Sequence, residues 1–264
     1  MPDIHLEMLT PMFLHGADNE TLELRSPAFK GLFRYWWRAT QDEPEQNKLY
    51  KREGVLFGDT THRSPLVVRI MGAPRLTIGS YAPLPHRAGS FTREAYLPSS
   101  QFALTLICRD FDIYQPIIRI SFLLGGVGNR SRRGFGSLHE RGGGVQNRDE
   151  LGRYILESLE WLRPGTFAWH EDTIVSTLAH PGYPVIKKIE IGQSWSDPHA
   201  LLKHIGQATH HHAGRDLGGV NPRQASPLHV HVHKVNNSYV PIVTQMHSTL
   251  NHHKQQAFID IIVR

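Results

Sequence analysis

The stretch GGVGNRSRRGFGS, residues 125–137, holds five glycines and three arginines in thirteen positions. Glycine lacks a Cβ, so its backbone can turn through positive φ and approach a ligand closely. Arginine keeps its charge and presents a planar set of donors that suits phosphate oxygens. We therefore expect a flexible loop that closes over a sugar-phosphate backbone, while an aromatic ring stacks on a base. The residues expected to make these contacts are Gly126, Gly128, Arg130, Arg132, Arg133 and Phe135.

This loop differs from the two common glycine loops that bind nucleotides. It lacks the third glycine of a dinucleotide fingerprint, and no Gly-Lys-Ser or Gly-Lys-Thr follows it. Apolar residues recur at helical spacing from Ile113 to Leu124, so the loop follows the C-terminus of a predicted helix, whereas a nucleotide-binding glycine loop precedes the N-terminus of one. A helix C-cap glycine followed by a solvated basic loop is the alternative. The arginines that flank the loop favour a nucleic-acid partner: Arg119, Arg141, Arg148 and Arg153.

Length and composition leave room for one large or two modest domains, because the chain has 264 residues and 39% of them are hydrophobic. The formal net charge of +5 is mildly basic, so it permits a polyanionic partner without identifying one. No apolar run is long enough to span a membrane, and the N-terminus lacks the features of a signal peptide. The single cysteine, Cys108, excludes an intrachain disulfide and fits a reducing compartment. We therefore expect a cytoplasmic protein.

A second basic feature lies on a predicted helix. The Ser26-Pro27 pair predicts a serine cap followed by a first-turn proline, and the helix is expected to end near Ala39. Its expected apolar arc consists of Phe29, Leu32, Phe33, Trp36, Trp37 and Ala39. Its basic stripe, at i, i+4 and i+8, consists of Lys30, Arg34 and Arg38. Like charges at this spacing destabilise a helix, so we expect a polyanion to neutralise the stripe, with a solvated face as the alternative.

The remaining pattern mixes strands and helices. Predicted strands lie at residues 4–8, 64–71, 101–109, 135–139 and 185–191, with a hairpin of 228–235 and 239–244 about Asn236-Asn237. Predicted helices lie at residues 114–124, 150–161, 198–207 and 251–263. Residues 41–51 are expected to form a charged linker, 54–58 an apolar turn, and 72–98 a long irregular insertion with one short strand at 76–78.

This order predicts an α+β protein. The first half approaches the split βαβ unit of a ferredoxin-like domain. The second glycine run, at residues 142–144, is a plausible boundary, so we expect one domain at residues 1–145 and a second α+β domain at 146–264. No sequence repeat is convincing, so any duplication would be structural.

Histidine is abundant, with 18 residues, and His229, His231 and His233 alternate along a predicted strand. Alternation places all three imidazoles on one face, where they could ligate Zn²⁺. Since no cysteine or HExxH motif supports such a site, we favour an exposed or aromatic-like strand face. The cluster at residues 210–212 is expected to be solvated loop, and no metal or other cofactor is predicted.

Several segments together resemble a known family. Residues 125–138 are similar to the glycine-rich loop of the RAMP superfamily of CRISPR proteins. Among the members of this superfamily, the first subunit of the Cmr complex, the type III-B CRISPR effector, is the one that residues 9–17, 24–39 and 56–58 resemble. Residues 214–230 resemble that subunit more loosely. The resemblance covers most of the first 140 residues. The histidine clusters at 210–212 and 252–253 are not part of the pattern, and the chain is compact for this subunit.

The resemblance implies two tightly packed ferredoxin-like (RRM-like) domains, the second reduced or irregular here. It implies a non-catalytic subunit that binds guide and target RNA, contacts other Cmr subunits and caps the effector near the guide's 3′ end. By position, the expectation of RNA contact passes to Lys30, Arg34, Arg38, Arg130, Arg132, Arg133, Arg215 and Arg223.

A metal-independent ribonuclease that processes guide RNA is the alternative from the same superfamily. It needs a general acid or base near neutral pH, and His15 and His62 are the candidates. Such enzymes carry their glycine loop near the C-terminus, whereas about 125 residues follow it here, which favours the non-catalytic interpretation.

Overall fold

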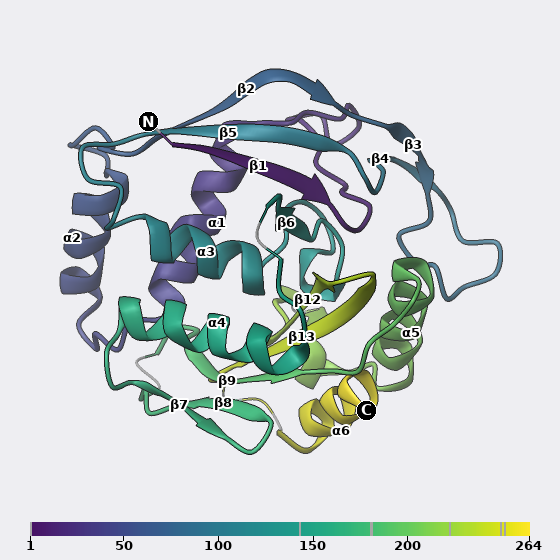
Figure 1. Cartoon of the computed structure of the whole chain (residues 1–264). Coiled ribbons are helices and arrows are strands. Elements are labelled where there is room, and N and C mark those ends of the chain that lie inside the picture. Colours follow the sequence, from purple (N-terminus) through teal and green to yellow (C-terminus); the bar gives the residue numbers. More distant parts are fainter. Residues whose placement is uncertain (1, 143, 180–181, 222, 249, 251) are drawn as a thin grey trace.

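Two antiparallel sheets, one from each half of the chain, enclose a layer of helices between them (Figure 1). The computed structural model describes residues 2–142, 144–179, 182–221, 223–248, 250 and 252–264. Gly143, in the predicted boundary run, and Asn251, at the predicted start of the last helix, lie outside the described residues. None of the described helices is long and apolar enough to cross a membrane.

The first sheet belongs entirely to the N-terminal half. Its order is β2 (Val67–Arg75), β5 (Gln101–Ile107), β1 (Asp3–Met8) and β6 (Leu138–Glu140), and every neighbouring pair is antiparallel. Helix α1 (Ser26–Ala39) follows β1, and α3 (Gln115–Leu124) follows β5. Both helices cover the inner face of the sheet, where alternate strand side chains such as Leu6 and Leu104 are fully buried (Figure 1).

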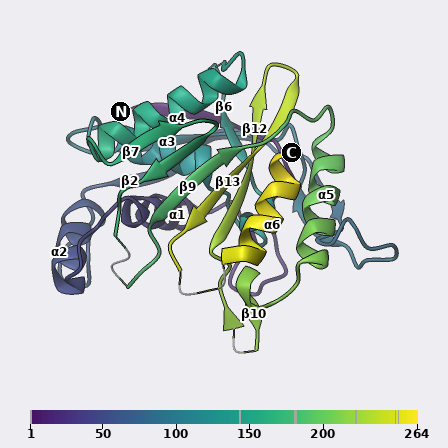
Figure 2. The same cartoon turned by 90° about the horizontal axis from the view of Figure 1, so that it is seen from below.

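The second sheet has five strands in the order β12 (Leu228–Val235), β13 (Ser238–Met246), β9 (Ile186–Ile191), β8 (Thr173–Ser176) and β7 (Phe167–His170). Helix α4 (Arg148–Leu162) packs on its inner face, and α5 (Pro198–His211) and α6 (His252–Val263) pack on the other (Figures 1 and 2). The second half repeats the chain order strand–helix–strand–strand–helix of the first half, here as β9–α5–β12–β13–α6. Within the sheet, β13 lies between β9 and β12, as β5 lies between β1 and β2. The strand on the other side of β9 is β8, which precedes β9 in the chain, whereas β6 in the first sheet follows the other elements.

Hydrophobic cores cross the predicted boundary between residues 145 and 146. One core packs Trp36 and Leu124 against Ile155 and Ile189. Another packs Phe13 and Phe135 against Leu201, Leu202 and Phe258. Although each sheet lies wholly on one side of residue 145, the two halves share buried surface. The division into two domains therefore stays a prediction.

Most predicted elements are present, and the mixed α+β class is confirmed. Helix α1 has the predicted bounds, and Trp36 is 1% exposed, but Arg25 occupies the cap position and Ser26 makes no cap hydrogen bond. The hairpin of β12 and β13 turns at Asn236, whose φ is 51°. Helix α5 runs to His211, so His210 and His211 are helical rather than loop residues.

Three predictions of irregular structure were wrong. Helix α2 (Gln46–Phe57) occupies the expected linker and turn, because Leu49, Glu53 and Phe57 are buried at helical spacing. The insertion contains a hairpin of β3 (Ile78–Tyr81) and β4 (Arg93–Tyr96). Strands β7 and β8 were not predicted, because each spans only four residues. The remaining short elements are the 3₁₀ turns Ser131–Arg133 and Arg215–Leu217 and the paired strands β10 (Gly219–Val220) and β11 (Arg223–Gln224).

Candidate nucleic-acid interface

The glycine loop is folded tightly against the protein rather than held open, so the expected flexibility is corrected. The backbone N–H of Val127 donates to the carbonyl of Gly136, and that of Gly134 donates to the carbonyl of Val230, at 3.0 and 2.9 Å. A Cβ on Gly136, whose φ is 63°, would lie 1.9 Å from the carbonyl oxygen of Val127. The missing side chain therefore permits close packing of the loop on itself.

Gly126 and Gly128 likewise permit close packing of the loop backbone. A Cβ on Gly126 would lie 2.6 Å from the carbonyl oxygen of Phe135, and one on Gly128 would lie 2.5 Å from that of Phe13. Gly125 ends α3 in an extended conformation, so no left-handed C-cap forms there. The alternative of a C-cap and a solvated loop is wrong, because residues 133–138 are buried. Direct contact of Gly126 or Gly128 with RNA stays a prediction.

The ring of Phe135 does not offer a face to a base. The residue is 1% exposed, and its ring lies 5.4 Å from that of Phe13 and 6.1 Å from that of Tyr81, centroid to centroid. It also contacts the core formed by α5 and α6. The predicted stacking role is therefore corrected to a core role, because tertiary packing covers an aromatic side chain that its glycine neighbours suggested was accessible.

Arg133 is likewise buried, at 8% exposed, and binds main-chain oxygens in place of phosphate. Its guanidinium donates to the carbonyls of Leu217 and Leu228, at 2.9 and 3.0 Å, and to the hydroxyl of Ser226, at 3.0 Å. Burial, with the nearby charges of Arg130 and Arg132, lowers the pKa of Arg133 to about 10. Arg133 thus fixes the loop to the second half of the chain and adds positive potential without direct contact.

Arg130 and Arg132 are the accessible cations of the loop. The guanidinium of Arg132 lies 5.8 Å from the centroid of the Tyr35 ring and donates to the carbonyl of Ser226. Arg130 has a left-handed backbone with φ of 60°, lies over the ring of Phe135, and has an Nε with no hydrogen-bond partner. Burial lowers the pKa of Arg130. No carboxylate of the described residues forms an ion pair with any of the three loop arginines.

The structure brings Arg215 and Arg223 to this loop. Arg132 and Arg133 bind the carbonyls of Ser226 and Leu217, which lie on the segment that carries both residues. Arg215 and Arg223 are themselves exposed. The side chains of Arg132 and Arg133 therefore attach the loop to the segment that carries the other two predicted cations.

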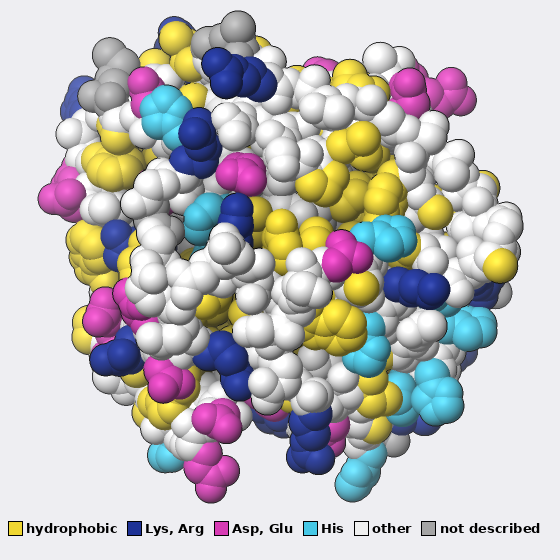
Figure 3. Space-filling view, turned by 45° about the vertical axis from the view of Figure 1, so that its right-hand side comes forward, with side chains coloured by type: hydrophobic (Ala, Val, Ile, Leu, Met, Phe, Trp, Pro, Cys, Tyr) yellow, Lys and Arg dark blue, Asp and Glu magenta, His cyan; other side chains and the backbone are white. Residues whose placement is uncertain are grey.

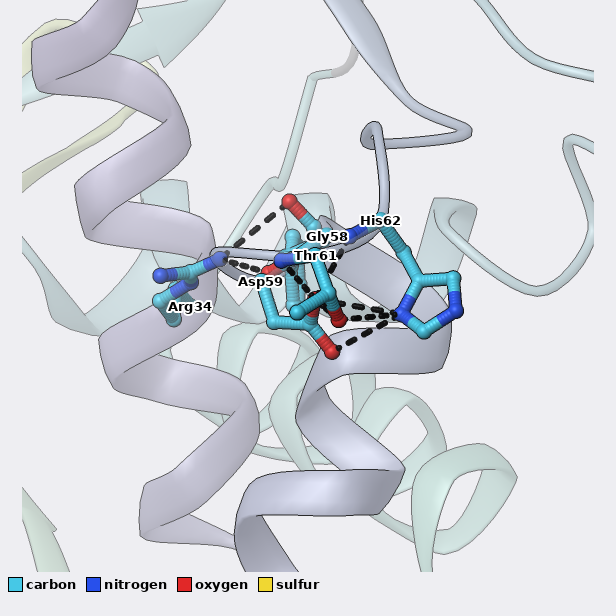
Figure 4. A network of polar contacts seen from close by, with 6 residues as sticks. Arg34, Gly58, Asp59, Thr61 and His62 are labelled. Atoms are coloured by element: carbon cyan, nitrogen blue, oxygen red, sulfur yellow. Dashed lines mark hydrogen bonds and ion pairs between the residues drawn. The ribbon is translucent and has the colours of Figure 1, made fainter.

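One carboxylate, that of Glu53, pairs with two of the three cations of the stripe on α1. Three positive charges and one negative charge leave the stripe positive, so the expected contact with a polyanion stays a prediction. Arg34 pairs with Glu53 at 3.1 Å, and Arg38 donates to the same carboxylate at 2.8 Å. Arg34 also donates to the carbonyls of Phe57 and Gly58, as Figure 4 shows for Gly58. Lys30 forms no ion pair within the described part of the chain, and burial and the Arg34 charge lower its pKa. Since Arg132 lies over Tyr35, the residue after Arg34, the loop and the stripe occupy adjacent sides of α1.

Tyr35 and His229 complete this region, and the sequence interpretation missed both roles. The Tyr35 hydroxyl lies 2.8 Å from Nε2 of His229, and the His229 ring packs 5.2 Å from that of Trp36. Burial and the charges of Arg132 and Arg133 hold the pKa of His229 well below its usual value. The aromatic run at residues 35–37 was the available signal for Tyr35, but nothing local linked it to residue 229.

The three alternating histidines of β12 are buried, so the prediction of an exposed strand face was wrong. Their rings pack against other rings, as the alternative of an aromatic-like face predicted. His231 Nδ1 lies 2.6 Å from the carbonyl oxygen of Gly125. Across the described residues, no group of three or more His, Cys, Asp or Glu side chains could hold a metal ion. The side chain of His252 lies outside the described residues.

The two candidate bases of the ribonuclease interpretation lie in different loops. His15 is 6% exposed, and burial and the Arg93 charge lower its pKa. His62 is exposed beside the carboxylate of Asp59, which accepts hydrogen bonds from Thr61 and His62 (Figure 4). These hydrogen bonds, led by that of the Thr61 hydroxyl, lower the pKa of Asp59 to about 2. No contact joins His15 to His62 in the part of the chain that the structure describes.

Charges of both signs are interspersed on the face in Figure 3, with hydrophobic side chains gathered in its centre and several histidines at one side. No single-sign field covers that face, in keeping with the modest net charge of +5.

Comparisons with known proteins agree with this architecture. Residues 5–139 match the model of the RAMP superfamily. The chain is 27% identical over 170 residues to the CRISPR system Cmr subunit Cmr1-2 of Pyrococcus furiosus, a match that covers 50% of this chain and 91% of that relative. It is 30% identical over 161 residues to Cmr1-1 of the same organism, which covers 52% of this chain but only 46% of that relative.

Solved structures share the fold over nearly the whole chain. Cmr1 from Pyrococcus furiosus in its apo form has a TM-score of 0.62 at 19% identity and covers 94% of this chain and 88% of its own. A chain of the type III-B Cmr-beta complex bound to cognate target RNA has a TM-score of 0.60 at 11% identity, with 98% of both chains covered. The family match spans half of the sequence and includes the glycine loop and the helix before it, and the chain belongs to the RAMP superfamily.

Proposed function

We propose that this chain is a non-catalytic, RNA-binding subunit of a type III-B CRISPR (Cmr) effector complex. The observation that carries the proposal is the group of three loop arginines without a carboxylate partner among the described residues. Uncompensated guanidiniums held close together repel one another, and a phosphate backbone offsets that repulsion. The curated relatives named as Cmr subunits and the Cmr-beta structure bound to target RNA support the choice of partner.

The RNA partners are guide and target RNA, and the protein partners are other Cmr subunits, with this chain capping the complex near the guide's 3′ end. Arg130, Arg132, Arg215 and Arg223 form the proposed contact surface, and Lys30 lies at its edge. Guanidiniums that reach phosphate and ribose carry little sequence information, so binding should show little base preference. A location in the cytoplasm, where such an effector meets RNA, is part of the same proposal.

The ferredoxin-like description of both halves also belongs to the proposal. In the first sheet, β5 lies between β1 and β2, and β6 lies on the other side of β1, which supports a split βαβ unit. In the second half the same succession from β9 to α6 supports a modified version of that unit.

Salt-dependent RNA binding tests the proposal. Arg130 and Arg132 are changed together to alanine, and affinity for a single-stranded RNA is measured at several salt concentrations. We expect weaker binding with little sequence dependence, and a slope of log affinity against log salt that falls by about 1–2. Arg163→Ala is the matched control, because that arginine is paired with Asp42. An unchanged slope in the double variant would remove the loop as the phosphate site.

The ribonuclease alternative retains one supporting observation, the exposed His62 beside Asp59. A carboxylate next to an imidazole can orient it as a general base. The full chain is incubated with repeat RNA, with and without chelator. We expect intact RNA in every sample. Cleavage that persists in chelator and disappears in His62→Ala or His15→Ala would overturn the non-catalytic assignment.

A further inference from the structure

A cavity of about 470 Å³ lies where the two halves of the chain meet, between α3 and β6 on one side and α4 and β12 on the other. Its apolar lining includes Phe122, Leu123, Leu138 and Val145. It is separate from the loop arginines, because Arg133 donates to the carbonyl of Leu228 at one end of β12, whereas His233, further along the strand, lines the cavity. Its size is typical of a pocket for one small ligand.

Two imidazoles in the cavity have ring nitrogens without a hydrogen-bond partner among the described residues. His233 is 5% exposed, and both of its ring nitrogens are of this kind. The ring of His139 lies 5.2 Å from that of His233, and its Nδ1 also has no partner. Burial lowers the pKa of both histidines, so each presents one donor and one acceptor as a neutral ring. Buried polar atoms in native proteins are nearly always hydrogen-bonded, so these atoms indicate a ligand that can bond to them.

The walls of the cavity favour a planar group. The guanidinium of Arg119, on α3, lies 4.7 Å from the centroid of the Tyr154 ring, on α4, and both residues line the cavity. Arg153, Glu140 and Glu157 also line it. This mixture of charges contrasts with the loop arginines, which have no carboxylate partner among the described residues, and it does not suit a polyphosphate. It suits a ring that both donates and accepts hydrogen bonds and carries at most one phosphate.

We propose that this cavity receives a single unpaired base of bound RNA, with His233 and His139 hydrogen-bonded to the base edge and the sugar at the charged rim. Single-stranded RNA is recognised by bases that leave the stack and enter such pockets. The inference rests on the proposed RNA-binding function and adds a base site to the phosphate site of the loop. The two sites lie on opposite sides of the buried His231, which hydrogen-bonds Gly125 and packs against His233.

Titration with mononucleotides tests the base site apart from the loop. The full chain is titrated with the four nucleoside 5′-monophosphates and with ribose 5-phosphate, which lacks a base, by calorimetry and by NMR of the histidine ring protons. We expect saturable binding of at least one nucleotide that shifts the His139 and His233 resonances, and no such shift with ribose 5-phosphate. Arg132→Ala should leave this affinity within about twofold, because distant sites behave independently.

Two variants alter the cavity itself. His233→Phe keeps a ring and removes its hydrogen bonds, so nucleotide affinity should fall by about three- to tenfold. Gly144→Trp places an indole at the lining, where a Cβ meets only Gln146 Nε2 at 3.4 Å, and should abolish binding. Circular dichroism shows whether each variant is folded. If His233→Phe does not fold, the nucleotide affinity of Gly144→Trp tests the base site by itself.

Three outcomes would overturn the base site. The first is no nucleotide binding by a chain that still binds an RNA oligonucleotide through its loop, a result that leaves the proposed function intact. The second is equal binding of ribose 5-phosphate, which would assign the cavity to phosphate alone. The third is loss of association with other Cmr subunits in Gly144→Trp without nucleotide binding by the unaltered chain, which would assign the cavity to a protein side chain. Failure of the oligonucleotide itself to bind would instead contradict the proposed function.

Discussion

The guanidinium of Arg133 donates a 2.9 Å hydrogen bond to the main-chain carbonyl of Leu217, 84 residues further along the chain. This bond attaches the glycine loop to the segment that carries Arg215 and Arg223. Three arginines in four positions therefore divide into two kinds. Arg133 holds the site together, whereas Arg130 and Arg132 lie where RNA can reach them.

Arg133→Met should lower the free energy of unfolding by about 2–4 kcal/mol, because it leaves buried carbonyls without donors. Urea unfolding at neutral pH measures the change. Arg215→Met is the control, since Arg215 is exposed and its loss should alter stability by less than about 0.5 kcal/mol. Equal stability of Arg133→Met and the unaltered chain would show that the buried hydrogen bonds contribute nothing.

Glu53→Gln should destabilise the protein by about 1–3 kcal/mol, because the buried carboxylate pairs with both Arg34 and Arg38. The same variant removes the negative charge that faces these two cations on α1, so RNA should bind more tightly at low salt. Asp42→Asn breaks the more exposed pair with Arg163 and should change stability by less than about 1 kcal/mol. Weaker RNA binding in Glu53→Gln, with the fold intact, would contradict this account of the stripe.

Stability should fall as the pH drops below about 6.5, the ordinary pKa of histidine. The pKa values of His229, His231 and His233 are lowered by burial, that of His231 to about 4, so the folded state binds fewer protons than the unfolded state. Their stabilising contribution is nearly complete above pH 6.5 and is lost as the pH falls toward the folded pKa values. Well below pH 6.5, each histidine can remove about 1.4 kcal/mol per pH unit.

Urea unfolding at pH 7.5, 6.5 and 5.5 measures this effect. His233→Phe removes one of the three titrating groups, so the loss of stability between pH 6.5 and 5.5 should shrink by about 1 kcal/mol. A free energy of unfolding that stays constant down to pH 5.5 would show that these histidines titrate in the folded protein as they do in the unfolded chain.

Gly136→Ala should destabilise the chain far more than Gly31→Ala. A Cβ on Gly136 meets the Val127 carbonyl oxygen at 1.9 Å on a backbone with φ of 63°, whereas a Cβ on Gly31 meets nothing within 4 Å. Gly31 lies inside α1, where alanine should stabilise the helix by about 0.5–1 kcal/mol. Thermal unfolding of the two variants gives the comparison, and similar melting temperatures would contradict the packed geometry of the loop.

Local patterns were sufficient for elements whose signal lies within a few residues. The proline and apolar arc of α1 predicted its bounds, and Asn236-Asn237 predicted the turn between β12 and β13. Such signals depend on periodicity and turn chemistry, which neighbouring residues carry. Helix α2 escaped this reasoning because most of its exposed residues are polar and its few buried residues became apparent only against α1.

The sequence by itself determined the superfamily, the mixed α+β class and the positions of the clustered cations, because glycine spacing and residue charge are local properties. Only the tertiary structure decided which cations face solvent. Glu53 pairs with Arg34 and Arg38 from another helix, and the carbonyl of Leu217 binds Arg133 from the other half of the chain. The burial of a charged side chain depends on partners brought together by folding, and a helical projection or a short motif contains no information about those partners.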